Sequence, residues 1–260
     1  MSAVANFGPH LPILRRYARA MTGSQGSGDA CVRASLQAIL SSPDQISNSH
    51  PPKIELFRLF HAVWEPVQTA LASEMSARLQ RSALLLTAVE GFSLAEASIV
   101  LARPIEQVQA EVARAREEIE AENCGDILII EDESIIALHI QTLVEDAGHN
   151  VLGIATTHAE AMKQIAAQKP DIILADIHLA DGSSGIDAVK EILENNTIPV
   201  IFITAYPERL LSGERPEPTY LITKPFLPET VTATISQALF FHRETERNQR
   251  NADTVGTKVT

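Results

Sequence analysis

Four polar steps in the second half of the chain carry residue types suited to phosphoryl transfer. Each comes directly after an apolar run, and they are Glu131-Asp132, Asp176, Thr204 and Lys224-Pro225. Carboxylates gathered at one place stay ionised only beside a compensating cation, and hard oxygen ligands of this kind suit Mg²⁺. With the metal in place, Asp176 could attack a phosphoryl donor while the Thr204 hydroxyl and the Lys224 ammonium bind the transferred oxygens.

The runs before these steps predict the strands of a parallel sheet. From residue 125 to 242, short apolar runs alternate with amphipathic helical stretches, which is typical of a sheet covered by helices. The expected strands are 127–130, 151–154, 172–175, 200–203 and 220–222, and the expected helices are 134–147, 159–168, 185–193 and one after Pro228. Only a turn or two of helix is expected near 208–211, because 206–219 contains three prolines and a glycine. Ligands bind at the carboxyl ends of parallel strands, so the four steps should face one crevice.

Residues 1–122 have the pattern of helices throughout. The expected helices are 11–21, 29–40, 53–63, 77–89, 93–101 and 104–120, with turn or stop residues at 22–24, 41–43, 51–52, 66 and 91. Ser93 and Glu96 have the spacing of a capping box, and Pro104 suits the first turn of the following helix. The segment 77–120 therefore predicts a helix-turn-helix.

Length and composition favour two domains in a soluble, cytoplasmic protein. A chain of 260 residues can bury two cores. No stretch approaches the roughly 20 apolar residues that span a bilayer, and the start lacks a signal pattern, so no membrane partner is expected. Cys31 and Cys124 lack the spacing of a metal or redox site. The net charge of −12 falls mainly on residues 123–260, which hold 10 basic and 20 acidic residues against 11 and 13 in residues 1–122, and it disfavours general nucleic-acid binding.

The four steps, in their order along the chain, resemble the receiver domains of two-component response regulators. The resemblance covers residues 125–242 and implies an α/β, (βα)5 flavodoxin-like fold with a five-stranded parallel sheet. It implies that Asp176 is the phosphoacceptor, assisted by Thr204 and Lys224, and that a sensor histidine kinase or phosphotransferase is the donor. It further implies a cis Lys224-Pro225 bond. The implied Mg²⁺ ligands are Asp132, Asp176, the backbone carbonyl of His178, and Glu131 acting through water.

The residues that would report phosphorylation depart from the common receiver pattern. Many receivers use an aromatic residue three positions before the lysine, where this chain has Leu221. The stretch from Phe202 to Tyr206 resembles a motif of an atypical receiver subgroup that places a tyrosine beside the phosphate-sensing threonine. Tyr206 is therefore a candidate switch residue, and the alternative is that it only packs on its loop.

The helical half resembles an extracytoplasmic-function sigma factor, with residues 1–63 similar to region 2 and residues 77–120 similar to region 4, which reads promoter DNA. Affinity for DNA would require basic residues on the recognition helix. The predicted helix has none from Pro104 until Arg114, and its first turns carry Glu106 and Glu111. The short polar stretch 41–53 also leaves little room for a promoter-melting segment. The pattern favours a protein partner and no DNA.

A sigma-like half followed by a receiver resembles the PhyR-type regulators of the alphaproteobacterial general stress response. The resemblance covers nearly the whole chain and implies an all-α sigma-factor-like domain at 1–122, a receiver at 125–242 and a flexible tail at 243–260. It implies that phosphorylation lets the sigma-like domain capture an anti-sigma factor of NepR type, freeing a sigma factor, and that the protein is not a conventional enzyme. Two alternatives are direct promoter binding through the helix-turn-helix, and a phosphate sink with the helical half as a lid.

Overall fold

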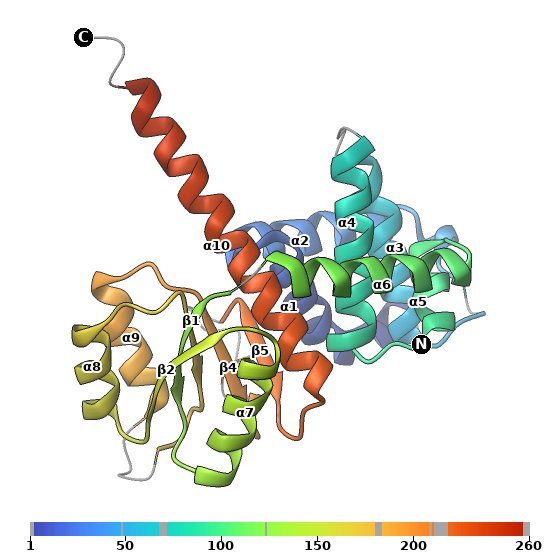
Figure 1. Cartoon of the computed structure of the whole chain (residues 1–260). Coiled ribbons are helices and arrows are strands. Elements are labelled where there is room, and N and C mark those ends of the chain that lie inside the picture. Colours follow the sequence, from blue (N-terminus) through green and yellow to red (C-terminus); the bar gives the residue numbers. More distant parts are fainter. Residues whose placement is uncertain are drawn as a thin grey trace. The chain divides into compact units, whose positions relative to one another are not determined.

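The computed structural model describes residues 3–47, 49–67, 72–122, 124–179, 184–207, 210 and 218–256. The chain forms two compact units, residues 1–121 and residues 122–260. In Figure 1 the first unit consists of helices, and the second contains a sheet flanked by helices. Among the described residues, no helix is both long and apolar enough to cross a membrane.

The first unit is helical throughout its described part, as the sequence predicts. Its elements are a 3₁₀ helix at Ala3–His10, α1 (Leu11–Thr22), α2 (Gln25–Ser41), a 3₁₀ turn at Pro43–Gln45, α3 (Pro52–Val67), α4 (Ala72–Leu84), a π-helical turn at Leu85–Val89, α5 (Leu94–Leu101) and α6 (Ile105–Glu122). Helix α2 begins earlier than predicted because the Ser24 side chain accepts a hydrogen bond from the Ser27 amide and caps it. The predicted capping box of Ser93 and Glu96 is confirmed at the start of α5.

Buried aromatic rings and ion pairs hold the first unit together. Tyr17, Phe57 and Phe60 are fully buried, and the ring centroid of Tyr17 lies 5.2 Å from that of Phe57. Helices α1 and α2 are joined by the buried guanidinium of Arg19, which donates to both carboxylate oxygens of Asp29 at 2.9 and 3.0 Å. A buried charge is tolerable only with such paired partners, so this contact fixes how the two helices cross.

Gly28 lies at a close approach of α2 to α1, and replacing it should separate the helices. A Cβ at this position would come within 2.6 Å of the backbone N and Cα of Arg19, whereas a Cβ at Gly26 would meet nothing within 4 Å. We expect Gly28→Ala to lower the free energy of unfolding of the helical unit by about 3 kcal/mol. The matched Gly26→Ala should change it by less than about 1 kcal/mol.

Urea unfolding followed by the fluorescence of Trp64 measures this difference, because Trp64 is the chain's single tryptophan and lies in the helical unit. Equal unfolding midpoints for the two alanine variants would contradict the proposed helix contact.

His61 should make the helical unit sensitive to acid. The hydroxyl of Tyr17 and Nε2 of His61 lie 2.8 Å apart in the buried interior, and burial lowers the pKa of His61 to about 3. In the unfolded chain His61 has the ordinary histidine pKa of about 6.5 and binds a proton below that pH. In the folded chain it stays neutral until the pH is much lower. The contribution of His61 to the free energy of unfolding is therefore complete above pH 6.5. It is lost as the pH falls from 6.5 toward 3, by about 1.4 kcal/mol per pH unit.

Urea unfolding at several pH values, in wild type and in His61→Gln, checks this prediction. Glutamine keeps a polar partner for the Tyr17 hydroxyl but cannot titrate, so the variant should lose stability less steeply in the same pH range. Parallel pH profiles for the two proteins would show that His61 is not the titrating group.

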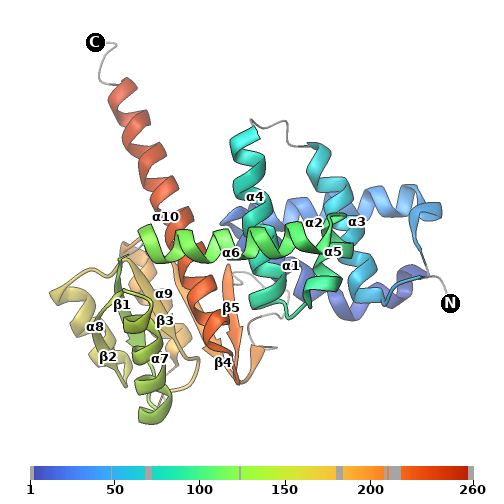
Figure 2. The same ribbon diagram turned by 45° about the vertical axis from the view of Figure 1, so that its right-hand side comes forward.

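The second unit is the predicted five-stranded parallel sheet with helices on both faces. Its elements are β1 (Asp126–Ile130), α7 (Ser134–Asp146), β2 (Asn150–Ala155), α8 (His158–Ala167), β3 (Ile172–Ala175), α9 (Gly185–Asn195), β4 (Val200–Thr204), β5 (Tyr220–Thr223) and α10 (Pro228–Gly256). The strand order is β2-β1-β3-β4-β5, and all neighbouring strands are parallel. Figures 1 and 2 show α8 and α9 on one face of the sheet and α7 and α10 on the other. Because both faces are covered, the central strands are continuous apolar runs.

Two predictions for the second unit need comment. The helical turn expected near 208–211 lies outside the described residues apart from Leu210. The tail expected to be flexible from residue 243 is instead helical to Gly256, since α10 continues that far. Residues 243–255 contain no proline or glycine and include three arginines and two glutamates, so a helix already formed on the sheet can extend through them.

Candidate functional site

The residues predicted to do chemistry lie at the carboxyl ends of four strands. Glu131 directly follows β1, Asp176 follows β3, Thr204 is the last residue of β4 and Lys224 follows β5. Main-chain hydrogen bonds continue the sheet into this region, from the Asp176 amide to the Ile130 carbonyl and from the Lys224 amide to the Thr204 carbonyl, both at 2.8 Å. The backbone that carries these side chains is therefore as fixed as the sheet itself. The Lys224-Pro225 bond is cis, which confirms that expectation.

Lys224 joins two of the predicted acidic residues. Its Nζ lies 2.7 Å from Oε2 of Glu131 and 2.7 Å from Oδ2 of Asp176. Glu131 and Asp176 are only 1% and 8% exposed, so these contacts form largely out of water. Burial alone would lower the pKa of Lys224, but the hydrogen bonds and charges of Asp176 and Glu131 outweigh it and raise that pKa. Burial raises the pKa of Glu131, and the Lys224 ammonium offsets this effect only in part. The lysine is thus the resident cation of a site rich in carboxylates.

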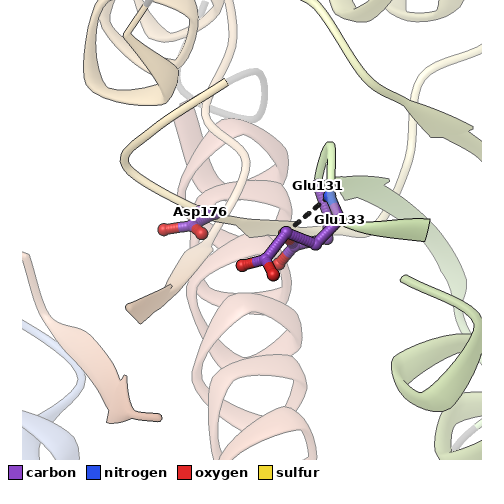
Figure 3. A group of neighbouring side chains, drawn as sticks. All are labelled: Glu131, Glu133 and Asp176. Carbon is purple, nitrogen blue, oxygen red and sulfur yellow. Dashed lines mark hydrogen bonds between the residues drawn. The ribbon is translucent and has the colours of Figure 1, made fainter. Parts of the chain in front are cut away.

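Glu133 is a third acidic residue at this site, which the sequence reasoning passed over. Its carboxylate lies 3.9 Å from Lys224 Nζ, and its amide donates to Oε1 of Glu131 at 3.2 Å. Figure 3 shows the Glu133 carboxylate extending toward Asp176, with Glu131 beside it. The signal in the sequence was the unbroken acidic run of residues 131–133 directly after the first strand.

The three carboxylates fit a divalent cation. Glu131, Glu133 and Asp176 each offer an oxygen, and these oxygens lie within 4.8 Å of one another. In the described part of the chain, these three negative charges face one positive charge, that of Lys224, so a further cation would relieve their repulsion. Carboxylate oxygens are the donors that hard cations such as Mg²⁺ prefer.

Two predicted metal ligands are not part of that group of carboxylates. Asp132 is half-buried beside Glu131, and His178 lies two residues after Asp176, where its backbone pairs with Ser184 in an isolated bridge. Their roles as ligands stay predictions. The sheet fixes the backbone position of Asp132 but not the direction of its side chain. The sequence therefore could not show that Asp132 lies outside the group of three carboxylates.

Thr204 is connected to the candidate switch residue Tyr206. The Thr204 side chain is fully buried, and its hydroxyl oxygen accepts a hydrogen bond from the Tyr206 amide at 3.1 Å. Tyr206 is 49% exposed, and its ring meets the His178 ring edge-on, with centroids 5.5 Å apart. Leu221, at the usual aromatic switch position, is 2% exposed and belongs to the apolar core. The loop after β4 is therefore linked to the loop after β3 through an exposed tyrosine.

Gly185 is a second residue that the sequence reasoning missed. Its amide donates to the Ile177 carbonyl at 2.8 Å, and a Cβ at this position would come 1.8 Å from the carbonyl oxygen of Asp176. Asp176 is further held by the Ile177 amide, which donates to its Oδ1 at 2.5 Å. The available signal was a glycine at the first position of the helix that follows the acidic step.

Three family models match successive parts of the chain. They are the sigma2 domain of PhyR at residues 7–61, the PhyR sigma-like domain at residues 74–122 and the response regulator receiver domain at residues 127–236. The phyllosphere-induced regulator PhyR of Methylorubrum extorquens is 48% identical over 254 residues, which cover 92% of this chain and 95% of the relative. The chain belongs to the PhyR family.

Solved structures of PhyR have the same fold. The response regulator PhyR of Brucella abortus is 48% identical, with a TM-score of 0.88 over 97% of this chain and 100% of that one. The anti-anti-sigma factor PhyR of Bartonella quintana is 46% identical, with a TM-score of 0.87 over 95% of this chain and 100% of that one. The resemblance to PhyR-type regulators, inferred from the order of the two halves, is thus confirmed.

Proposed function

We propose that this chain is a phosphorylation-controlled anti-anti-sigma factor. When Asp176 carries a phosphoryl group, the helical unit captures an anti-sigma factor of NepR type, and the sigma factor held by that partner is released. This proposal rests on one observation, which is that a single chain combines two features. It has an acidic site at the carboxyl ends of the strands, bridged by Lys224, and a helical unit that matches both PhyR sigma-type family models. The PhyR of Bartonella quintana is described as an anti-anti-sigma factor and has been crystallised with NepR.

The chemistry proposed for Asp176 is acceptance of a phosphoryl group from a sensor kinase, a phosphotransferase or a small acyl phosphate. A carboxylate oxygen of Asp176 attacks phosphorus, the bond to the donor breaks, and an acyl phosphate forms on the side chain. A bound Mg²⁺ would neutralise the charge of the site during transfer. Lys224, already hydrogen-bonded to Oδ2 of Asp176, is placed to pair with a phosphoryl oxygen. In this role the chain serves as a regulator rather than as an enzyme.

Tyr206 is the proposed reporter of phosphorylation. A new phosphoryl group of about −1.5 to −2 charges would attract the Thr204 hydroxyl, whose oxygen now accepts from the Tyr206 amide. Movement of Thr204 would therefore pull on the loop that carries Tyr206. Shifting the equilibrium between the inactive and active conformations from 1:99 to 99:1 requires about 5.5 kcal/mol of differential binding. Capture of the partner would supply part of that energy.

The surface of α6 supports a protein partner over DNA. From residue 104 to residue 113 the helix has no basic residue, and its exposed positions include Ile105 and Glu106. An acidic and apolar surface would repel phosphates and can bury against protein. A gel shift at low salt with this chain in both phosphorylation states would detect promoter binding and so favour the alternative.

Capture of purified Bartonella quintana NepR, measured by calorimetry, tests the proposed function. Acetyl phosphate with Mg²⁺ should strengthen binding at least about tenfold, equivalent to about 1.4 kcal/mol. Identical affinity with and without the phosphodonor would contradict control by phosphorylation. No capture in either state would contradict an anti-sigma factor of NepR type as the partner.

Phosphoryl uptake should require Mg²⁺. Asp132 should contribute more than Glu133 to the affinity for this ion. The Glu133 side chain is 64% exposed, whereas Asp132 is half-buried and is the ligand that the receiver pattern implies. We expect Asp132→Asn to weaken Mg²⁺ binding about tenfold or more and Glu133→Gln to weaken it less. Magnesium titrations followed by backbone amide shifts in the receiver provide the measurement. A larger loss in Glu133→Gln would assign the ion to the group of three carboxylates instead.

A further inference from the structure

Of the three grouped carboxylates, that of Glu133 borders solvent. Its side chain is 64% exposed, whereas those of Glu131 and Asp176 are 1% and 10% exposed. Glu133 is the N-cap residue of α7, but its side chain makes no capping hydrogen bond to the described residues of that helix. Figure 3 shows the carboxylate extending toward Asp176 instead. Glu133 therefore lies at the opening of the acceptor site, between the buried carboxylates and solvent.

Glu133 is also the carboxylate of this group that Lys224 neutralises least. The Lys224 ammonium forms hydrogen bonds of 2.7 Å to both Glu131 and Asp176. The nearest Glu133 oxygen lies 3.9 Å from the same nitrogen, beyond hydrogen-bond distance. Three carboxylates and one ammonium leave the site negative, and Asp132 beside Glu131 adds a further negative charge. The charge of Glu133 is thus largely uncompensated among the described residues when no cation is bound.

This charge opposes the arrival of a phosphoryl group. A phosphoryl group carries about 1.5 to 2 negative charges at neutral pH, and Lys224 is the cation that the described residues place at the site to receive it. An anion paired with Lys224 would lie close to the Glu133 carboxylate, because the two side chains are 3.9 Å apart. In water-like surroundings, one unit charge at about 4 Å changes the affinity for a singly charged ion about fivefold. A divalent cation bound among the carboxylates would cancel that repulsion.

We propose that Glu133 is a charge gate for the acceptor site, meaning that its carboxylate repels phosphate-type anions from Lys224 until a divalent cation is bound. The inference rests on the proposed function and adds to it a residue that makes phosphoryl entry depend on the cation. Glu133 takes no part in the transfer, in which an Asp176 oxygen bonds to phosphorus and the bond from phosphorus to the donor breaks. With acetyl phosphate as donor, acetate leaves. A gate of this kind acts on the incoming anion and needs no large share in the affinity for the cation.

Binding of inorganic phosphate tests the gate without any transfer chemistry. The ¹⁵N-labelled full-length chain is titrated with phosphate at an ionic strength of about 0.1 M, once in EDTA and once with saturating Mg²⁺. The backbone amide signals of Thr204 and Lys224 report binding. In EDTA, Glu133→Gln should bind phosphate at least about threefold more tightly than wild type, because glutamine keeps the size of the side chain and removes the like charge. With Mg²⁺, the difference should shrink to less than about twofold.

Glu145→Gln is the matched control, because Glu145 is an exposed glutamate near the other end of α7. Twelve residues of helix separate it from Glu133 by about 18 Å, more than the screening length of about 10 Å at this ionic strength. Its phosphate affinity in EDTA should therefore stay within about twofold of wild type.

Three results would overturn the gate. The first is phosphate binding in EDTA that is no tighter in Glu133→Gln than in wild type, including no detectable binding by either protein. The second is an equal gain in Glu145→Gln, which would show a general effect of net charge. The third is a gain that persists undiminished with Mg²⁺. None of these results bears on the capture of NepR, which tests the proposed function separately.

Discussion

Asp176→Asn should abolish phosphoryl uptake and leave capture of the anti-sigma factor unresponsive to phosphodonor. Asparagine retains the size of the side chain and can still accept from the Ile177 amide, but its amide is not a nucleophile. Incorporation of phosphate from acetyl phosphate should fall at least about 100-fold, to the background of an unactivated protein. The measurement is phosphate-affinity electrophoresis of wild type and variant, followed by calorimetry with NepR.

Asp187→Asn is the matched control for this variant. Asp187 lies in α9 with its side chain 68% exposed, so the same chemical change there should leave uptake within about twofold of wild type. Undiminished phosphorylation of Asp176→Asn would assign the acceptor to another residue. A parallel loss in both variants would point to a general effect of charge on the receiver.

Gly185→Ala should disable the same site by a purely steric route. The added methyl would come 1.8 Å from the Asp176 carbonyl oxygen, far inside contact distance, and backbone atoms cannot move aside as a side chain can. We expect the free energy of unfolding of the receiver to fall by about 3 kcal/mol, with loss of phosphoryl uptake because the acceptor loop must shift. Thermal unfolding by calorimetry and phosphate incorporation measure the two effects.

Gly153→Ala provides a control with a tight contact of another kind. A Cβ at Gly153 would meet the Oε1 atom of Gln164 at 2.4 Å, but that atom is the far end of a flexible side chain. Its cost should be at most about 1 kcal/mol, with phosphoryl uptake retained. If Gly185→Ala is no more destabilising than Gly153→Ala, then the acceptor loop tolerates a Cβ and the steric argument is wrong.

The sequence alone determined the two halves, the strand positions and which polar residues lie together at the strand ends. The strands of the receiver are short apolar runs bounded by turns and helices, and these signals are local. The carboxyl ends of parallel strands meet at one edge of a sheet, so Glu131, Asp176, Thr204 and Lys224 could be named in advance as neighbours. The charge-poor start of α6 likewise predicted a protein partner, because affinity for DNA depends on basic residues that a sequence displays directly.

Only the tertiary structure decided which side chains meet. Glu133 rather than Asp132 joins Glu131 and Asp176, because the direction of a side chain after a strand depends on its own rotamer and neighbours. The close approach of Gly185 to the carbonyl oxygen of Asp176 is likewise a contact that no periodicity in the sequence records. Helix α10 extended beyond its apolar pattern, since a helix anchored by packing can propagate through polar residues. Periodicity records which residues are buried, whereas contacts across helices and loops exist only once the elements have packed.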